Sequence, residues 1–257
     1  MAPGARAAHN APMYDVGPAP QQPRPLPRAP RLPGVPVVRE DTDAVLDALC
    51  ADVASQARSC VRAFGDFHLA LSAPPALEPL LVRLMLDPRF RDVPWKRTRL
   101  WMVDEVDVPD DHPEARFPRL SDTLASQADI PPEQVHRLRA RSDDDAHAYE
   151  RELREVLEWR EKGQDRLDMV ILDLAPHPPA PDSPPADAFP PVVPERLAIH
   201  LPGSSTAAPA RSTLTLGFVN AARFVAVHAP GADRRAALAR VSAAFATSDT
   251  PPDSGSG

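Results

Sequence analysis

Apolar positions recur along the chain with two periods, and the periods predict helices and strands in alternation. Helices are expected over residues 43–64, 77–86, 119–127, 143–162 and 234–245. Strands are expected over residues 67–72, 97–104, 167–174, 212–216 and 223–228, with a turn at 220–222. This alternation predicts an α/β fold, a doubly wound and mostly parallel sheet with helices on both faces.

The predicted strands also supply the predicted core. The strand over residues 167–174 is almost continuously apolar, which is typical of a strand buried on both faces. We expect eight strand side chains to be buried: Leu69, Leu71, Leu100, Met102, Val170, Leu172, Val225 and Val227.

Proline marks the limits of this domain, since most of the 34 prolines fall within residues 3–36 and 176–209. Residues 1–36 are predicted to be a disordered arm, residues 37–246 one domain with a proline-rich loop at 175–210, and residues 247–257 a disordered tail. Within the arm, residues 24–30 resemble a basic polyproline-II ligand of SH3-like domains. A stiff, solvated tail is the alternative interpretation.

Charge and cysteine content narrow the class of protein. The net charge of −7 argues against a broad nucleic-acid-binding surface, and with only two lysines in the chain arginine must bind any anion. Cys50 and Cys60 lie on one predicted helix about 15 Å apart, too far to form a disulfide. No apolar run approaches the ~20 residues of a membrane span, and residues 1–15 lack the apolar core of a signal peptide. A cytoplasmic protein that binds no membrane is expected.

Three segments resemble a known family in their order. They are the strand at residues 67–72, the strand at 99–105 that ends in Asp104-Glu105, and Pro131-Pro132-Glu133-Gln134-Val135. Together they resemble the 6-phosphogluconolactonase family, which shares a superfamily with the glucosamine-6-phosphate isomerases and deaminases. The resemblance covers residues 43–245 and implies a sugar phosphate as ligand, with no cofactor.

In a doubly wound sheet, ligands bind beyond the carboxyl ends of the strands. After the first strand, the family carries a Ser-Gly-Gly-Ser-Thr-Pro loop that can surround a phosphate. This chain has Ser72-Ala73-Pro74-Pro75, so two N–H donors and the glycines are missing. Ser72 is the one side chain kept, and it either binds phosphate or simply forms a turn at the strand end.

After the second strand, the family motif Asp-Glu-Arg is here Asp104-Glu105-Val106, so a substrate-binding guanidinium is missing. Neighbouring strand residues point to opposite faces, so we expect Asp104 to act in the site and Glu105 to form a structural ion pair. Arg116 lies where the family has Ser-Asn-Tyr, and either replaces the lost cation or is a solvated loop arginine. The acidic loop at residues 107–112 lacks a second group of ligands, and no metal site is predicted.

After the third strand, the family motif Gly-x-Gly-x-Asp-Gly-His carries the histidine thought to be its general base. Aligned on the strand, Pro179 occupies that position, and proline has no titratable group. His177 is two residues away and is the candidate base, with an ordinary loop histidine as the alternative.

The fourth loop is the best preserved. Gly231-Ala232-Asp233-Arg234 matches the family's Gly-x-x-Lys, in which the lysine meets the phosphate. We expect anion binding to centre on Arg234 at a helix start, unless it is a surface arginine paired with Asp233. Arg211 matches another family arginine, and either contacts substrate or caps its strand. Arg116 and Arg211 are expected to be secondary to Arg234.

Two main hypotheses follow. In the first, the chain is a non-catalytic or strongly impaired relative that binds a sugar phosphate or serves as a scaffold for an unidentified protein partner. In the second, it is an active lactonase with a rebuilt site, with His177 as base, Asp104 as orienting residue and arginines for the phosphate. An isomerase or deaminase is less favoured, because residues 131–137 are more similar to the lactonase branch.

Overall fold

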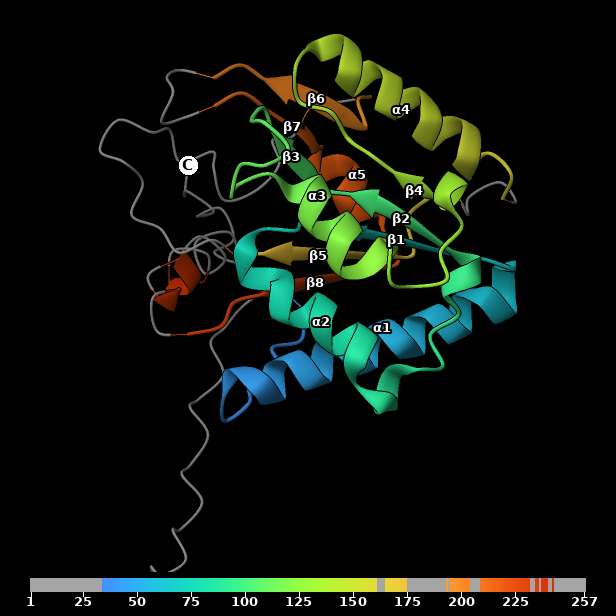
Figure 1. The fold of residues 1–257 in the computed structure, drawn as a ribbon, viewed down its shortest axis with the longest axis vertical. Coiled ribbons are helices and arrows are strands. Elements are labelled where there is room, and N and C mark those ends of the chain that lie inside the picture. The colour runs from blue at the N-terminus through green and yellow to red at the C-terminus, as the bar shows by residue number, and fades with distance from the viewer. Residues whose placement is uncertain are drawn as a thin grey trace, which may run out of the picture.

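A five-stranded parallel sheet forms the centre of the molecule (Figure 1). The computed structural model describes residues 34–160, 165–174, 193, 195–203, 209–231, 234–235, 237–239 and 242. The strand order is β4-β2-β1-β5-β8, and every pairing in this sheet is parallel. The strands are β1 (Phe67–Leu71), β2 (Thr98–Met102), β4 (Val135–His136), β5 (Met169–Asp173) and β8 (Phe224–His228). The predicted doubly wound, mostly parallel sheet is confirmed.

Helices lie on both sides of this sheet, with α1 (Thr42–Phe64) and α2 (Glu78–Leu86) below it and α4 (Asp143–Leu157) above it in Figure 1. Helix α1 begins where the Asp41 carboxylate accepts the N–H of Ala44 at 2.8 Å, and it ends at Gly65, whose φ of 89° favours glycine. The helix predicted at 119–127 instead begins at α3 (Arg116–Leu120) and continues as a π-helical segment, Ser121–Ala125. Helix α5 (Leu216–Ala221) occupies most of the predicted turn at 220–222.

A second, three-stranded sheet was not foreseen. It consists of β3 (Asp104–Val106), β7 (Arg211–Leu214) and β6 (Ala198–Leu201), in the order β3-β7-β6 with antiparallel pairings. The sequence predicted a strand near β7 but left β6 inside the proline-rich loop. The small sheet matters for the site, because β3 continues directly from the carboxyl end of β2.

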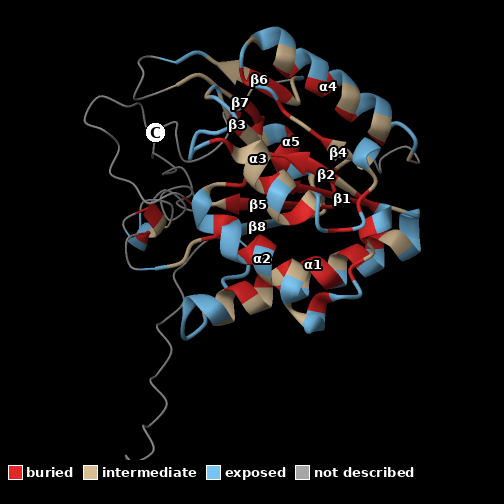
Figure 2. Ribbon diagram, in the orientation of Figure 1, coloured by how far each residue is buried: buried red, intermediate tan, exposed pale blue. Residues whose placement is uncertain are grey.

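The core lies between the central strands and the helices (Figure 2). Six of the eight predicted core side chains are buried, all of them on β1, β2 and β5. The prediction is wrong for Val225 and Val227, which are 36% and 48% exposed. Both belong to β8, which is the edge strand of the sheet among the described residues and pairs there with β5, so it is less covered than a central strand.

Charged residues are buried at the amino-terminal ends of the strands β1 and β5. We call this end the amino-terminal edge of the sheet. Asp168 is fully buried and is bound by Arg160 at 2.7 Å and Arg223 at 3.0 Å. Nearby, the Trp101 indole donates to Nδ1 of His68 at 3.2 Å, and His68 Nε2 lies 2.9 Å from Asp66. Since Nδ1 accepts, Nε2 carries the proton toward Asp66, and burial lowers the pKa of His68 although the Asp66 carboxylate opposes that shift.

Candidate functional site

Three residues from separate segments meet at the carboxyl ends of β1 and β2. Ser72, which follows β1, is buried and donates its hydroxyl to Oδ1 of Asp104 at 2.9 Å. The other carboxylate oxygen of Asp104 forms an ion pair with Arg116, the first residue of α3. We call Ser72, Asp104 and Arg116 the strand-end cluster. The structure therefore brings together three of the residues that the sequence singled out.

Arg116 is not a solvated loop arginine, because only 16% of its side chain is exposed. Burial lowers the pKa of Arg116 to about 10, and repulsion from Arg211 and Arg119 acts in the same direction, while Asp173 opposes the shift. Because Arg211 and Arg119 are near enough to repel Arg116, three guanidinium groups gather at this edge of the sheet. Such a concentration of cations favours an anionic ligand.

Glu105 was expected to form a structural ion pair. In the structure its hydrogen-bond donors are backbone N–H groups instead. Its two carboxylate oxygens accept the backbone N–H groups of Arg116 at 2.9 Å and of Phe117 at 2.8 Å. These are N–H groups of the first turn of α3, which have no partner within the helix. Burial raises the pKa of Glu105, although the backbone hydrogen bonds oppose that shift. Glu105 thus fixes the start of α3 and, with it, the backbone that carries Arg116.

Arg119 is a site residue that the sequence analysis missed. Its Nη1 donates to the carbonyl oxygen of Ala73 at 3.2 Å, and it also donates to the carbonyl oxygen of Pro113. The loop after β1 is thus tied to α3 through a carbonyl group. The available signal was spacing, since Arg116 and Arg119 are three residues apart and lie on the same face of a helix.

Arg211 begins β7 and pairs with Val106 of β3. Residues that pair directly across two antiparallel strands have side chains on the same face. Arg211 therefore lies beside the position at which the Asp104-Glu105-Val106 motif lacks its arginine. The positive charge of Arg211 lowers the pKa of Arg116, so Arg211 lies near the strand-end cluster.

Arg234 is buried rather than on the surface. Its guanidinium donates to the carbonyl oxygens of Leu174 at 2.8 Å and Pro230 at 3.1 Å, and Nη2 lies 3.3 Å from Oδ2 of Asp173. These contacts connect the end of β5 to the segment after β8. The N–H of Leu238 bonds to the carbonyl of Arg234, as a helix start requires, whereas Asp233 lies outside the described residues.

Asp173 also contacts a histidine that the sequence analysis did not single out. Nδ1 of His228 lies 2.9 Å from Oδ1 of Asp173, and the two side chains are 1% and 3% exposed. The signal was present in the pattern, because His228 is a polar residue that ends an otherwise apolar strand. The candidate base His177 and the proline at position 179 lie outside the described residues.

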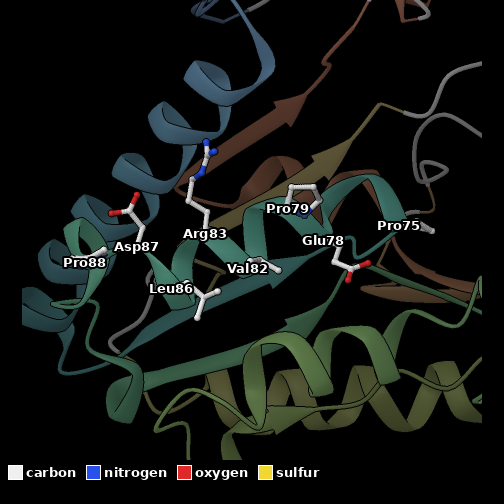
Figure 3. A pocket seen from close by; sticks show the side chains of 8 residues that line it. All are labelled: Pro75, Glu78, Pro79, Val82, Arg83, Leu86, Asp87 and Pro88. Carbon is white, nitrogen blue, oxygen red and sulfur yellow. The ribbon is translucent and has the colours of Figure 1, made fainter.

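A groove of about 700 Å³ lies elsewhere, along α2 (Figure 3). Glu78, Val82, Arg83 and Leu86 line it, and Arg83 is already paired with Asp43 and Asp47. The groove contains none of the residues of the strand-end cluster.

In the part of the chain that the structure describes, no three His, Cys, Asp or Glu side chains converge as metal ligands would. No helix of that part is long and apolar enough to cross a bilayer.

Comparison with known proteins agrees with this geometry. Residues 40–254 match the model of the family described as glucosamine-6-phosphate isomerases/6-phosphogluconolactonase. The human GDH/6PGL endoplasmic bifunctional protein is 30% identical over 212 residues, which are 78% of this chain but only 25% of that protein. This chain thus spans about a quarter of that relative's length. A 6-phosphogluconolactonase of Streptomyces coelicolor is 28% identical, over 79% of this chain and 80% of its own length.

Solved structures show the same fold. The 6-phosphogluconolactonase of Thermotoga maritima aligns with a TM-score of 0.61 at 20% identity, over 80% of this chain and 87% of that one. A monomeric glucosamine-6-phosphate deaminase aligns with a TM-score of 0.57 at 12% identity, over 78% and 84%. The family model matches most of the chain, and the fold is that of solved members of the family. The chain therefore belongs to the family of glucosamine-6-phosphate isomerases and 6-phosphogluconolactonases.

Proposed function

We propose that this protein is a 6-phosphogluconolactonase-like, sugar-phosphate-binding protein in which lactone hydrolysis is strongly impaired. The observation that carries the proposal is the buried Arg116, held by Asp104 and repelled by Arg119 and Arg211. A bound phosphate would relieve that repulsion, because it adds negative charge where three guanidinium groups meet.

The arginines most suited to the ligand are Arg116 and Arg211. Arg234, which the sequence favoured, already donates to two carbonyl oxygens and pairs with Asp173. Its contacts suit a residue that holds β5 and the segment after β8 together. We therefore place the phosphate beside α3 and β7, with Arg234 behind it as support.

The residues of two loops support the proposal that lactone hydrolysis is impaired. Pro74 and Pro75 have no N–H groups to offer a phosphate, and the carbonyl of Ala73 already accepts from Arg119. Pro179 stands at the position of the family's histidine, so the usual general base is missing. The alternative, a fully active lactonase with a rebuilt site, has the Streptomyces coelicolor relative in its favour, since that protein is named for the activity.

Titration of 6-phosphogluconate, monitored by calorimetry, tests the binding proposal. Arg116→Gln and Arg211→Gln should each weaken binding about tenfold or more, since a charge-assisted hydrogen bond is worth about 1.5–3 kcal/mol. Arg58→Gln is the control, because Arg58 forms an exposed ion pair with Asp92 far along α1. Absence of binding to the wild-type protein, or equal binding by all four proteins, would refute the proposal.

The rate on fresh 6-phosphogluconolactone tests the impairment separately. We expect the wild-type rate above spontaneous hydrolysis to be at least a hundredfold below that of the Streptomyces coelicolor relative, measured side by side. Comparable rates would instead establish the active lactonase. The same purified protein serves both experiments, so binding and hydrolysis are judged independently.

A further inference from the structure

His228 is a buried histidine whose two ring nitrogens have different surroundings. Nδ1 lies 2.9 Å from Oδ1 of Asp173, and only 1% of the His228 side chain is exposed. Nε2 is buried and has no hydrogen-bond partner in the part of the chain that the structure describes. Leaving a buried polar atom unpaired costs about 1–3 kcal/mol, so this nitrogen calls for a ligand or a water molecule.

The contact with Asp173 determines where the proton of the neutral ring lies. A carboxylate accepts hydrogen bonds only, so Nδ1 carries the hydrogen and donates it to Asp173. The lone pair of the neutral imidazole is therefore at Nε2. A histidine that is oriented by a carboxylate on one nitrogen and free on the other has the arrangement of a general base.

Arg234 holds the other side of Asp173. Its Nη2 lies 3.3 Å from Oδ2, while Oδ1 is left for His228. The guanidinium restricts the rotation of the Asp173 carboxylate, because it also donates to the carbonyl oxygens of Leu174 and Pro230 and is itself held in place by them. Asp173 and Arg234 are thus positioning residues for the His228 ring.

The pair lies at the edge where the ligand is proposed to bind. Asp173 and His228 pair across β5 and β8 at the carboxyl ends of both strands. Asp173 is also near enough to Arg116 to oppose the fall in its pKa. The His228–Asp173 pair and the strand-end cluster therefore occupy the same end of the sheet.

We propose that His228 is the general base for the residual lactone hydrolysis of this protein, an inference that rests on the proposed function. Nε2 accepts a proton from water while the water oxygen bonds to the lactone carbonyl carbon. The ring C–O bond then breaks, and the leaving oxygen takes the proton back from Nε2. Lactone and water give one hydroxy acid, and the neutral imidazole is restored.

The test is the rate on fresh 6-phosphogluconolactone above spontaneous hydrolysis, for the wild type and His228→Gln. We expect a measurable wild-type rate that falls at least tenfold in the variant, with 6-phosphogluconate affinity kept within threefold. His147→Gln is the matched control, because His147 is half exposed on α4 and pairs with Asp143. Equal rates for the wild type and His228→Gln, or a wild-type rate no faster than spontaneous, would overturn the role of His228. Neither result bears on sugar-phosphate binding, which the titration of 6-phosphogluconate into the wild type and the arginine variants tests separately.

A measurement on the unaltered protein keeps the proposal testable if His228→Gln does not fold. Nitrogen-15 NMR of labelled histidine should show His228 protonated at Nδ1 and its Nε2 resonance shifted by 6-phosphogluconate. A hydrogen on Nε2 in the neutral ring, or no shift with saturating ligand, would overturn the inference.

Discussion

Arg211 pairs with Val106 across the antiparallel strands β7 and β3. The two side chains therefore share a face, with Cβ atoms expected about 4.5–5.5 Å apart. Val106 is the position at which the resembled family carries an arginine after Asp-Glu. This chain has Val106 at that position, and its cross-strand neighbour Arg211 is near enough to Arg116 to lower the pKa of that guanidinium.

Restoring that cation should strengthen ligand binding at a cost in stability. In Val106→Arg, a fourth guanidinium joins those of Arg116, Arg119 and Arg211, so we expect 6-phosphogluconate to bind about fivefold more tightly. Without ligand, like charges directly opposite should lower the free energy of unfolding by about 0.5–1 kcal/mol. Calorimetry and urea denaturation measure the two effects. Val82→Arg places the same charge on the exposed face of α2 and should change neither, whereas an unchanged affinity in Val106→Arg would contradict the proposed position of the phosphate.

Glu105 should matter for both stability and binding, because it holds the start of α3. Glu105→Ala leaves the N–H groups of Arg116 and Phe117 without their acceptor, and we expect the free energy of unfolding to fall by about 2–3 kcal/mol. Glu105→Gln keeps one acceptor oxygen and should lose about half as much. Urea denaturation measures the difference, with the exposed Glu114→Ala as control. Equal stability of Glu105→Ala and wild type would show that α3 needs no such cap.

The parallel sheet was predictable from sequence because its central strands are apolar on both faces. Leu69 and Val170 are both fully buried, as a pattern that is apolar on both faces of a strand predicts. Val225 and Val227 have the same residue type but lie on an edge strand, and strand order is not encoded in the local pattern. Strand β6 was missed for a different reason, since it lies inside the stretch at residues 176–209 whose prolines predicted a loop.

The site was only partly predictable. Ser72 and Asp104 were indicated by motif and strand end, and the structure joins them by a hydrogen bond. The burial of Arg116 and the pairing of His228 with Asp173 depend on contacts between distant segments, 55 residues apart in the second case. Arg234 shows the converse, because its motif was recognisable while its buried hydrogen bonds were not.

Both cysteines should be unreactive in the native protein. Burial raises the pKa of Cys50 and of Cys60 to about 12, and both are free thiols, as expected from their separation on α1. At pH 8 almost no thiolate is present, so Ellman's reagent should modify neither until guanidinium unfolds the chain. Ser126→Cys adds an exposed thiol as positive control and should react at once. Rapid modification of the native wild type would contradict the burial of α1.

Asp66 should make stability depend on acid pH. Burial alone would raise its pKa, but hydrogen bonds from His68 and Arg160 outweigh it and lower the pKa to about 2, from an ordinary value of 3.8. A carboxyl group whose pKa is lower in the folded state stabilises that state above its unfolded pKa, and the contribution disappears as pH falls through the folded value. The shift corresponds to about 2 kcal/mol, at 1.36 kcal/mol per pKa unit.

Asp66→Asn should therefore lower the free energy of unfolding by about 2 kcal/mol at pH 7, and this difference from wild type should shrink as pH falls below 4. About half of it should be gone at pH 3, where the unfolded wild-type chain has taken up most of a proton at this carboxyl and the folded chain has not. Urea denaturation at pH 7, 5, 4 and 3 measures the trend. Asp92→Asn is the control, because Asp92 is 59% exposed and its ion pair with Arg58 is worth at most about 1 kcal/mol. A difference between wild type and Asp66→Asn that stays constant over this pH range would show that the carboxylate charge of Asp66 does not stabilise the amino-terminal edge of the sheet.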